Sequence, residues 1–351
     1  MNKQRFRNIL VVRTDRIGDV ILSLPMIPVL RSNFPDAKIS MLVRAYTREL
    51  AEGQEGVWEV LCYDQSGSPR PFFSLLSEFR SKRFDVSVVA FPRFRIALLL
   101  FLARIPVRIA TGFRWYSFLF NERIYEHRKT AAKHEAEYNL ALLGPLGCEI
   151  PKTIRPVLLT TEKDRSTAAA ALKNLRLNGR RNIVVLHPGS GGSARDWKPE
   201  NFSALAVALE RRGLIVVVTG GKGEEALVQE VVSGAGGKVW SLVGALSLME
   251  LAAFVRFARV FVSNSTGTLH IAAAVGTPVV AFYPPVLVAS PQRWGPLTDK
   301  KAVFVPDRNR CQLCKGGECQ SNVCMDQITV AMVVEQVIKF AGLRKTVRRR
   351  S

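Results

Sequence analysis

Residues 262–270 of this chain read Val-Ser-Asn-Ser-Thr-Gly-Thr-Leu-His, and they connect two regular elements. The mostly apolar residues 259–262 predict a strand, and the small residues Ile271–Val275 predict a helix. Backbone N–H groups at the start of a helix are unpaired and partly positive, so such a junction binds anions readily. Gly267 would let a ligand approach the backbone closely. An ordinary capped helix after a strand is the alternative interpretation.

Three more loops have the same design. They cover residues 13–19, 187–194 and 219–223, after the apolar runs Ile9–Val12, Ile183–Leu186 and Leu214–Val218 and before the expected helices Val20–Leu30, Pro199–Arg211 and Glu224–Val232. Continuous Val, Ile and Leu runs are typical of strands buried on both faces of a parallel sheet. Ligands bind outside the carboxyl ends of such strands. The four loops therefore predict a cleft lined from two sides.

Strand-like and helix-like segments alternate along the chain, which predicts an α/β fold with parallel sheets. Strands are expected at Ile9–Val12, Ile39–Val43, Glu59–Cys62, Val86–Val89 and Val107–Ala110, and again at Ile183–Leu186, Ile215–Thr219, Val239–Leu242, Val260–Ser263 and Val279–Phe282. A length of 351 residues suits two hydrophobic cores. We expect an N-terminal domain over 1–160, a linker region with one helix over 161–181, a C-terminal domain over 182–330, and a last helix and basic tail over 331–351. The last helix could pack on either domain.

The net charge is +21, from 50 basic and 29 acidic residues. Residues 80–133 hold twelve Lys and Arg against three acids, and residues 344–350 add five basic residues and no acid. Such fields attract nucleic acid, anionic membrane surfaces or polyanionic substrates. No nucleic-acid-binding motif accompanies them, so a nucleic-acid partner is not expected. A solvated basic surface is the alternative.

Apolar segments argue against a membrane-spanning chain. The run Ile96–Ala103 has eight residues between Arg95 and Arg104, whereas a spanning helix needs about 20. The run at Ile9–Val12 is also too short for a signal peptide. The sequence therefore predicts a cytoplasmic protein.

The six cysteines fall into two groups. Cys62 and Cys148 are isolated and are expected to be buried, inert thiols. The other four, Cys311, Cys314, Cys319 and Cys324, lie within fourteen residues. They could bind zinc or an iron–sulfur cluster, although a second C-x2-C pair is missing, or they could stay reduced and pack. A reducing compartment argues against disulfides.

Several motifs, in this order, resemble glycosyltransferase family 9, the ADP-heptose:lipopolysaccharide heptosyltransferases. They are residues 9–20 with Leu24-Pro25, His187-Pro188-Gly189-Ser190 with Arg195-Asp196-Trp197, Pro199-Glu200 and Phe202, Gly220-Gly221 with Glu224, the Ser263–His270 loop, Thr277-Pro278, and the Cys311–Cys324 cluster. The resemblance covers nearly the whole chain. It implies the GT-B fold, two Rossmann-like domains with the active site between them. It also implies an inverting, metal-independent enzyme that requires no cofactor beyond its nucleotide-sugar substrate.

By this resemblance Asp19 is the general base that takes the proton of the acceptor hydroxyl. A general base contributes roughly 10²–10⁴ to a rate. The alternative for Asp19 is a helix cap. Arg195 stands where family members have a Lys that stabilises the leaving diphosphate, and Arg can grip phosphate with two hydrogen bonds. Lys198 is a second candidate for that role.

The resemblance implies a donor site made of loop residues. These are Gly189, Ser190, Glu224, Ser265, Thr266, Gly267, Thr268 and His270. Many members have Asp where this chain has Ser265, so the donor sugar could differ from a heptose. Glu224 could instead be a carboxylate favoured at a helix start, and His270 a core histidine.

The acceptor implied by the resemblance is an anionic glycolipid, the core linked to lipid A, at the cytoplasmic surface of the inner membrane. Gly18, Arg95, Arg108 and Arg114 are the expected acceptor-binding residues. The aromatic residues between 113 and 120 could touch lipid, but most of them are expected in the core.

These inferences predict a peripheral membrane enzyme that moves a heptose from ADP-heptose to the inner core of lipopolysaccharide. The same fold with another nucleotide sugar or another cell-envelope acceptor is one alternative. A catalytically degenerate protein that binds anionic membranes is the alternative of a different class.

Overall fold

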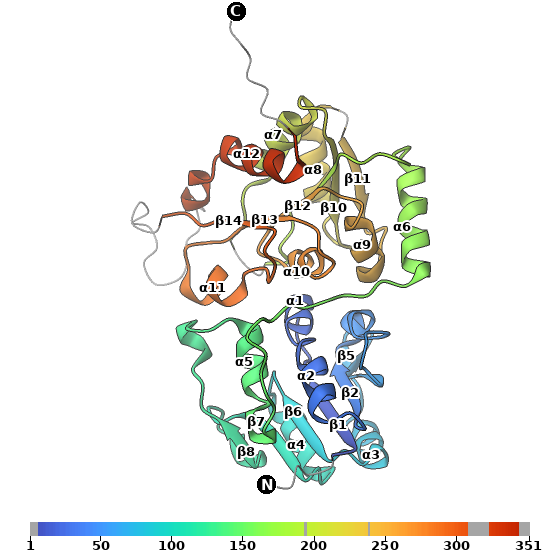
Figure 1. Ribbon diagram of the computed structural model, residues 1–351, viewed down its shortest axis with the longest axis vertical. Helices are drawn as coiled ribbons and strands as arrows, with labels where there is room; N and C mark the ends of the chain where they lie inside the picture. The colour runs from blue at the N-terminus through green and yellow to red at the C-terminus, as the bar shows by residue number, and fades with distance from the viewer. Residues whose placement is uncertain (1–5, 193–194, 238, 308–322, 344–351) are drawn as a thin grey trace, which may run out of the picture. The chain divides into compact units, whose positions relative to one another are not determined.

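The structure is a computed structural model and describes residues 6–192, 195–237, 239–307 and 323–343. The chain divides into two compact units, Met1–Leu159 and Thr160–Ser351. Figure 1 shows them in blue to green and in green to red. Each unit is built on a parallel sheet with helices packed against it. The predicted α/β fold with two Rossmann-like units is therefore confirmed.

In the first unit the described residues form a parallel sheet of six strands, in the order β3-β2-β1-β6-β7-β8. The strands are β1 (Asn8–Val12), β2 (Lys38–Val43), β3 (Glu59–Cys62), β6 (Val86–Val89), β7 (Val107–Thr111) and β8 (Glu122–Ile124). β1 and β6 lie in the middle and are almost fully buried, as their apolar runs predicted. The edge strand β8 was not predicted because Glu122 and Arg123 give it no apolar run. A short hairpin, β4 (Asp64–Gln65) and β5 (Ser68–Pro69), lies outside the sheet and was also not predicted.

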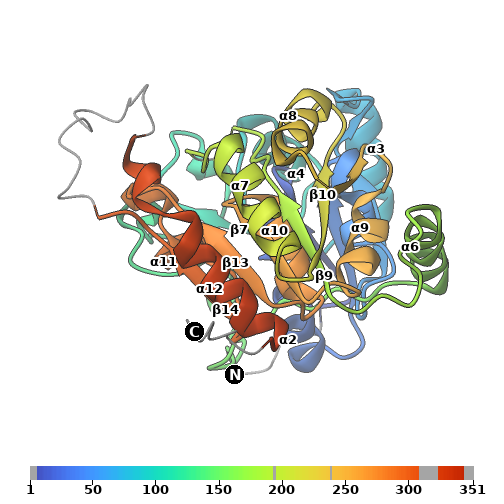
Figure 2. The same ribbon diagram turned by 90° about the horizontal axis from the view of Figure 1, so that it is seen from above.

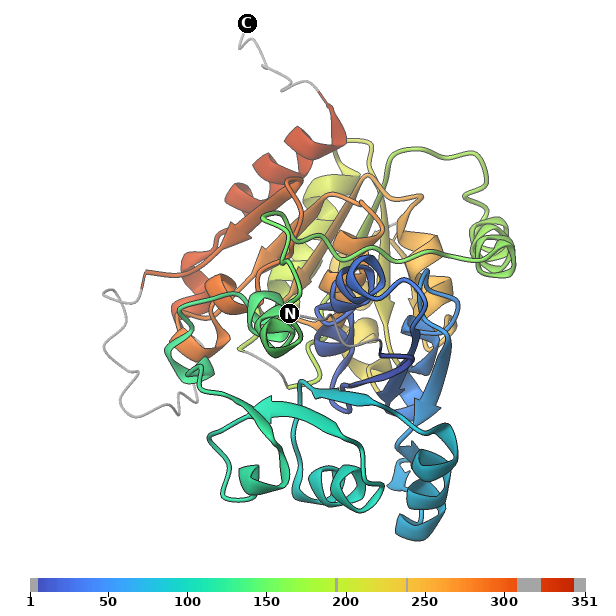
Figure 3. The same cartoon turned by 60° about the horizontal axis from the view of Figure 1, so that its bottom comes forward.

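Helices cover both faces of this sheet. α3 (Phe72–Lys82) and α4 (Phe94–Leu102) share a hydrophobic core with Leu10, Val12 and Val89. α2 (Met26–Asn33) and α5 (Glu135–Ala141) lie on the other side, as Figure 3 shows for the dark blue and green helices. α5 is tied to the chain before α2 because Asn139 donates from Nδ2 to the Leu22 carbonyl at 3.1 Å.

One predicted helix, Val20–Leu30, is wrong. The chain instead forms α1 (Ile17–Ile21) and then α2, with a turn over residues 22–25. Pro25 has no N–H with which to continue the first helix, and the Ser23 hydroxyl donates to the Asp19 carbonyl at 2.8 Å. Because α1 begins at Ile17, Asp19 lies in its first turn rather than in the loop.

In the second unit the described residues form another parallel sheet of six strands, in the order β11-β10-β9-β12-β13-β14. The strands are β9 (Ile183–His187), β10 (Ile215–Gly220), β11 (Val239–Val243), β12 (Val260–Asn264), β13 (Val279–Phe282) and β14 (Lys301–Phe304). The sequence predicted all of these except β14. That strand lies at the edge of the sheet and is only partly buried.

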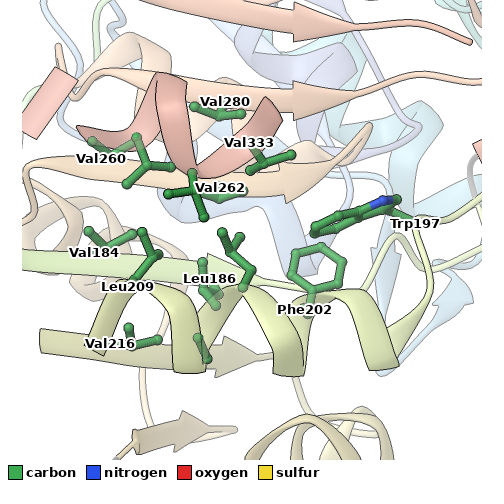
Figure 4. Packing of buried hydrophobic residues seen from close by; sticks show 14 of the residues in the cluster. Val184, Leu186, Trp197, Phe202, Leu209, Val216, Val260, Val262, Val280 and Val333 are labelled. Carbon is green, nitrogen blue, oxygen red and sulfur yellow. The ribbon is translucent and has the colours of Figure 1, made fainter. Parts of the chain in front are cut away.

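Alternate residues of these strands enter two different cores. On one face, Val184, Leu186 and Val262 pack with Trp197 and with the helices α7 (Pro199–Glu210), α8 (Glu225–Ala235) and α12 (Val330–Ala341), as Figure 4 shows in part. On the other face, a second core joins the strands to α6 (Glu162–Asn174), α9 (Leu248–Val255) and α10 (Gly267–Ala274). Figure 2 shows α7 and α12 on one side of the sheet and α9 and α6 on the other.

The sequence did not decide where the linker region and the last helix pack, and both contact the second unit. Residues 161–181 contain α6, whose Ala168, Ala171 and Leu172 enter the core shared with α9. The last helix, α12, packs on the second unit through Val333, Val337 and their neighbours. The described residues of this unit also form the short helix α11 (Pro291–Trp294).

Candidate active site

A buried arginine organises the carboxyl end of β1. The Arg13 side chain is 2% exposed and is surrounded by three carboxylates. Its Nε lies 2.8 Å from Asp15 Oδ1, and its Nη1 lies 3.2 Å from Glu135 Oε1. Nη2 forms a third ion pair with Asp19. Three groups that are close in the sequence and Glu135, which is 122 positions from Arg13, thus meet at one strand end.

Side chains of α5 hold the Arg13 guanidinium in place. Glu135 and Asn139 are four residues apart and therefore share one face of the helix. Asn139 accepts a hydrogen bond from Arg13 Nη1 at 3.0 Å and donates to the Ser23 hydroxyl at 3.1 Å. Arg128 adds an ion pair to Glu135. Sequence analysis missed Arg13, Glu135 and Asn139, although the two polar residues on one face of a short helix could have signalled the last two.

The charges in this cluster affect one another strongly. Burial alone would lower the pKa of Arg13, but Asp19, Asp15 and Glu135 outweigh it and raise that pKa. Burial, together with the nearby charge of Asp19, raises the pKa of Asp15 to about 7 against the opposing effect of Arg13. Asp15 and Asp19 keep 12% and 13% of their side chains exposed, so exposure does not distinguish them, and only Asp19 lies in the first turn of α1.

The expected acceptor residues behave differently from one another. Gly18 is buried in the first turn of α1. Arg95 donates to the Arg70 carbonyl, and Arg108 donates to the carbonyls of Leu119 and Ile105, so both side chains already bind this chain's own backbone. Burial also lowers the pKa of Arg108. Arg114, by contrast, is exposed.

The aromatic residues around Arg114 divide into two groups. Tyr116 and Phe120 are buried, as expected. Phe113, Trp115 and Phe118 are 44%, 74% and 63% exposed, so the expectation that most of this stretch is core is not met. The difference arises because Phe113 and Trp115 stand in the loop after β7, where the sheet has ended.

In the second unit, the carboxyl ends of β10, β9 and β12 are neighbours and bring three predicted loops together. Glu224 is the residue before α8, and its Oε2 accepts from the Gly221 N–H at 2.7 Å. A Cβ atom at Gly189 would overlap the Glu224 carboxylate, so a larger residue there would displace that side chain. Glu224 Oε2 also lies 3.8 Å from His187 Nε2, and burial lowers the pKa of that histidine.

The residues 262–270 open α10 as the sequence predicted, but the helix begins earlier, at Gly267. Thr266 precedes the helix and makes no side-chain capping bond, and the first turn contains no acid. Thr268 Oγ1 and Ser263 Oγ are buried and have no hydrogen-bond partner among the described residues. Buried hydroxyls without partners are uncommon in folded proteins, so this helix start can accept a ligand with anionic or hydroxyl oxygens.

The other predicted donor residues flank this helix start. The Ser265 N–H donates to the Phe282 carbonyl at 3.0 Å, and its side chain bonds to Tyr283, whose pKa is raised mainly by burial. His270 is buried within α10. Arg195 is half-buried in the loop between β9 and α7. Lys198 pairs with Asp326 at 2.7 Å.

Asp196 is a further candidate that sequence analysis quoted but gave no role. Ser190 donates to its Oδ2 at 2.9 Å, whereas Oδ1 is buried and has no partner within the described part of the chain. Burial raises the pKa of Asp196 to about 6, partly offset by Ser190. Its position directly after Arg195 was the only signal available.

The cysteine expectations have mixed outcomes. Cys311, Cys314 and Cys319 lie outside the described residues, and Cys324 is buried. Over the described ranges, no group of three or more His, Cys, Asp or Glu is placed to hold a metal ion. Cys62 and Cys148 are each partly exposed rather than buried, because Cys62 ends the edge strand β3 and Cys148 lies in a surface loop.

Within the described ranges, no helix has the length and apolarity needed to cross a bilayer.

Comparison with known proteins agrees with this architecture. Residues 72–324, more than half of the chain, match the family model for glycosyltransferase family 9 (heptosyltransferase). The chain is 29% identical over 280 residues to lipopolysaccharide heptosyltransferase 3 of Escherichia coli, covering 76% of this chain and 80% of the relative.

Two solved structures share the fold. A family 9 glycosyl transferase from Veillonella parvula superposes with a TM-score of 0.83 at 21% identity, covering 97% of this chain and 98% of the other. ADP-heptose lipopolysaccharide heptosyltransferase II of Escherichia coli gives a TM-score of 0.77 at 23% identity, covering 95% and 98%.

Proposed function

The chain belongs to glycosyltransferase family 9 and is a glycosyltransferase, and from this premise we propose that it moves a heptose from ADP-heptose to the inner core of lipopolysaccharide with inversion. The names of its relatives supply the donor and acceptor classes. The observation that carries the proposal is the pairing of Asp19 with the buried Arg13 at the carboxyl end of β1.

The reaction requires one base and one stabilised leaving group. The acceptor hydroxyl oxygen attacks the anomeric carbon of the donor sugar while the bond from that carbon to the diphosphate oxygen breaks. The hydroxyl proton passes to the Asp19 carboxylate, and ADP leaves with the bonding electrons. The ion pair with Arg13 fixes the orientation of the Asp19 carboxylate, which suits a general base.

The second unit supplies groups suited to the diphosphate and nucleoside. The uncapped N–H groups at the start of α10 and the Thr268 hydroxyl can donate to phosphate oxygens, where negative charge grows in the transition state. Arg195 is the cation proposed for the same charge. Glu224 can accept hydrogen bonds from ribose hydroxyls, as carboxylates do in related dinucleotide folds.

Ser265 motivates a second candidate function, the same reaction with another nucleotide sugar. Its hydroxyl bonds to Tyr283 and carries no charge, so it cannot replace an aspartate that binds sugar hydroxyls through a carboxylate. The acceptor in either case is an anionic glycolipid, reached at the cytoplasmic membrane surface, with Arg114 as an exposed cation toward it.

A thermal-shift screen tests the donor. Purified protein and a Ser265→Asp variant are each titrated with ADP, UDP, GDP, CDP and their sugar conjugates. Ligand that binds the folded state raises the Tm by mass action. We expect ADP and ADP-heptose to give the largest increase. A larger increase with another nucleotide would favour the second candidate, and no increase with any nucleotide would refute donor binding.

A further inference from the structure

Three neighbouring loops of the first unit carry exposed aromatic side chains. The loops follow β6, β7 and β8, which lie side by side and run parallel, so all three open at the same edge of the sheet (Figure 1). Phe94 is 42% exposed after β6, Trp115 is 74% exposed after β7, and Tyr125 is 61% exposed after β8. Phe94 is the first residue of α4, directly after the loop that follows β6, so exposed aromatic rings line three adjacent strand ends and form a surface there.

The rings are ordered by contact with one another. Phe94 and Trp115 stack with their centroids 4.9 Å apart. Tyr116 contacts both rings edge-on and anchors them, because its hydroxyl donates to the Pro92 carbonyl at 2.8 Å. Tyr125 contacts Phe113 edge-on, with ring centroids 5.5 Å apart, and lies over Gly112, where a Cβ atom would overlap it.

Two arginines border the stacked pair. Arg93 and Arg114 are both exposed, and each directly precedes one of the two stacked rings in the sequence. The Arg93 guanidinium carbon lies 5.0 Å from the centroid of the Phe91 ring, and the charges of both arginines partly offset the rise that burial causes in the pKa of Tyr116. Within the described part of the chain, neither arginine makes an ion pair with a carboxylate. The surface therefore offers flat aromatic faces beside two available cations.

This surface adjoins the catalytic strand end. β6 lies between β1 and β7, with Val12 opposite Val89 and Val88 opposite Ile109. Adjacent strands are about 4.8 Å apart, so the loop after β7 starts roughly 10 Å from the loop that leads to Asp19. That is the reach of a short oligosaccharide from a reacting hydroxyl.

A second link joins the aromatic loops to the base. The loop after β8 contains Arg128, which pairs with Glu135, and Glu135 pairs with Arg13. A ligand bound by the aromatic loops would therefore lie next to the ion-pair network that orients Asp19.

We propose that Phe94, Trp115, Arg93 and Arg114 form an acceptor subsite that stacks a sugar ring of an anionic oligosaccharide and pairs its phosphate or carboxylate groups. This proposal rests on the proposed function and adds which part of the acceptor the first unit would bind. The CH groups on one face of a sugar ring pack on aromatic rings, and guanidinium groups bind phosphate and carboxylate with two hydrogen bonds. Its place at the ligand-binding edge, beside the base, favours a glycan over a bilayer as its occupant.

The test measures acceptor binding directly, without a donor. The probe is a deacylated lipopolysaccharide inner-core oligosaccharide, which keeps its phosphates and carboxylates but cannot insert into a membrane. Its Kd is measured by calorimetry for the wild type, Trp115→Ala and Phe94→Ala. We expect each variant to weaken binding by about tenfold.

Trp58→Ala is the matched control. Trp58 is 62% exposed and precedes β3, so it stands at the opposite edge of the same sheet, with the Lys38 ammonium 4.3 Å from its ring centroid. We expect its oligosaccharide Kd to match the wild type. The increase in Tm caused by nucleotide should be the same in all of these proteins, because the substitutions lie in the other unit.

The outcomes separate this proposal from the proposed function. Unchanged oligosaccharide binding in Trp115→Ala, an equal loss in Trp58→Ala, or no binding by the wild type would each overturn the subsite. A loss of binding to phosphatidylglycerol vesicles with an unchanged oligosaccharide Kd would assign the surface to the bilayer and overturn it too. A missing nucleotide shift would instead count against the proposed function and leave the oligosaccharide result standing.

Discussion

The carboxyl edges of the two sheets have the same architecture and opposite chemistry. At the edge of the first sheet, Arg13, Asp15 and Asp19 are charged groups already paired with one another. At the edge of the second sheet, Thr268 and the start of α10 are neutral donors without partners in the described structure. The groups at the end of β1 are preassembled, whereas the start of α10 keeps its donors for a ligand, although Glu224 and Asp196 at the same edge already accept hydrogen bonds from this chain.

This difference fits the two roles proposed for the two edges. A proton acceptor must have its charge and orientation fixed before the substrate arrives, so its partners belong to the protein. An anion site needs donors that are directed outward and unused. Both edges follow buried apolar strands, and the loops alone decide which kind of site results.

Asp19→Asn should have the largest effect. The amide cannot accept the proton of the acceptor hydroxyl, so kcat should fall by about 10²–10⁴ or more. The increase in Tm caused by nucleotide should be unchanged, since the donor groups lie in the other unit. Asp36→Asn, at an exposed carboxylate before β2, is the control and should keep full activity. Equal activity of Asp19→Asn and the wild type would break the assignment of the base to the first edge.

Arg13→Gln should have the next largest effect, on stability. The substitution leaves Asp15, Asp19 and Glu135 without their shared buried cation, and breaking a buried ion pair in this way costs about 3–5 kcal/mol. Urea denaturation measures the free energy of unfolding. The control is Arg48→Gln, because Arg48 is 51% exposed and its pair with Glu52 lies at the surface, where a pair contributes about 0–1 kcal/mol. Similar losses in both variants would mean that the first edge is not preassembled by Arg13.

The sequence predicted those parts of the two edges that local patterns determine. Apolar runs predicted β1 and β9, and the loops after them contain the candidate residues. The Arg13 network was missed because Glu135 is 122 positions away and only the fold brings it near. Charge alone also did not reveal that Arg95 and Arg108 donate to backbone carbonyls of this chain, so their predicted contact with the acceptor stays a prediction. The break between α1 and α2 depended on Pro25, whose effect the apolar pattern concealed.

Asp15→Asn should sharpen the comparison through its pH dependence. The pKa of Asp15 is raised from 3.8 to about 7 in the folded protein, so the folded state binds the proton more tightly. The wild type therefore loses stability as the pH rises from about 4 to 7. The stability of the variant relative to the wild type should therefore be greater near pH 8 than near pH 5, by about 3 kcal/mol. Thermal unfolding at both pH values measures the difference, and an advantage that stays constant or reverses would contradict the raised pKa.

Thr268→Val should have the smallest effect and probes the second edge. Valine has nearly the same shape, and replacing a buried hydroxyl that lacks a partner with an apolar group is close to neutral for stability. The nucleotide, however, would lose a hydrogen-bond donor, so its Kd should rise by about tenfold. Thr277→Val is the contrast, because Thr277 is equally buried but donates to the Val255 carbonyl at 2.9 Å. That variant should lose about 1 kcal/mol of stability and keep its affinity. If Thr268→Val instead destabilised the protein and bound nucleotide normally, the Thr268 hydroxyl would stabilise the fold rather than bind the ligand. The start of α10 would then be preassembled, as the end of β1 is.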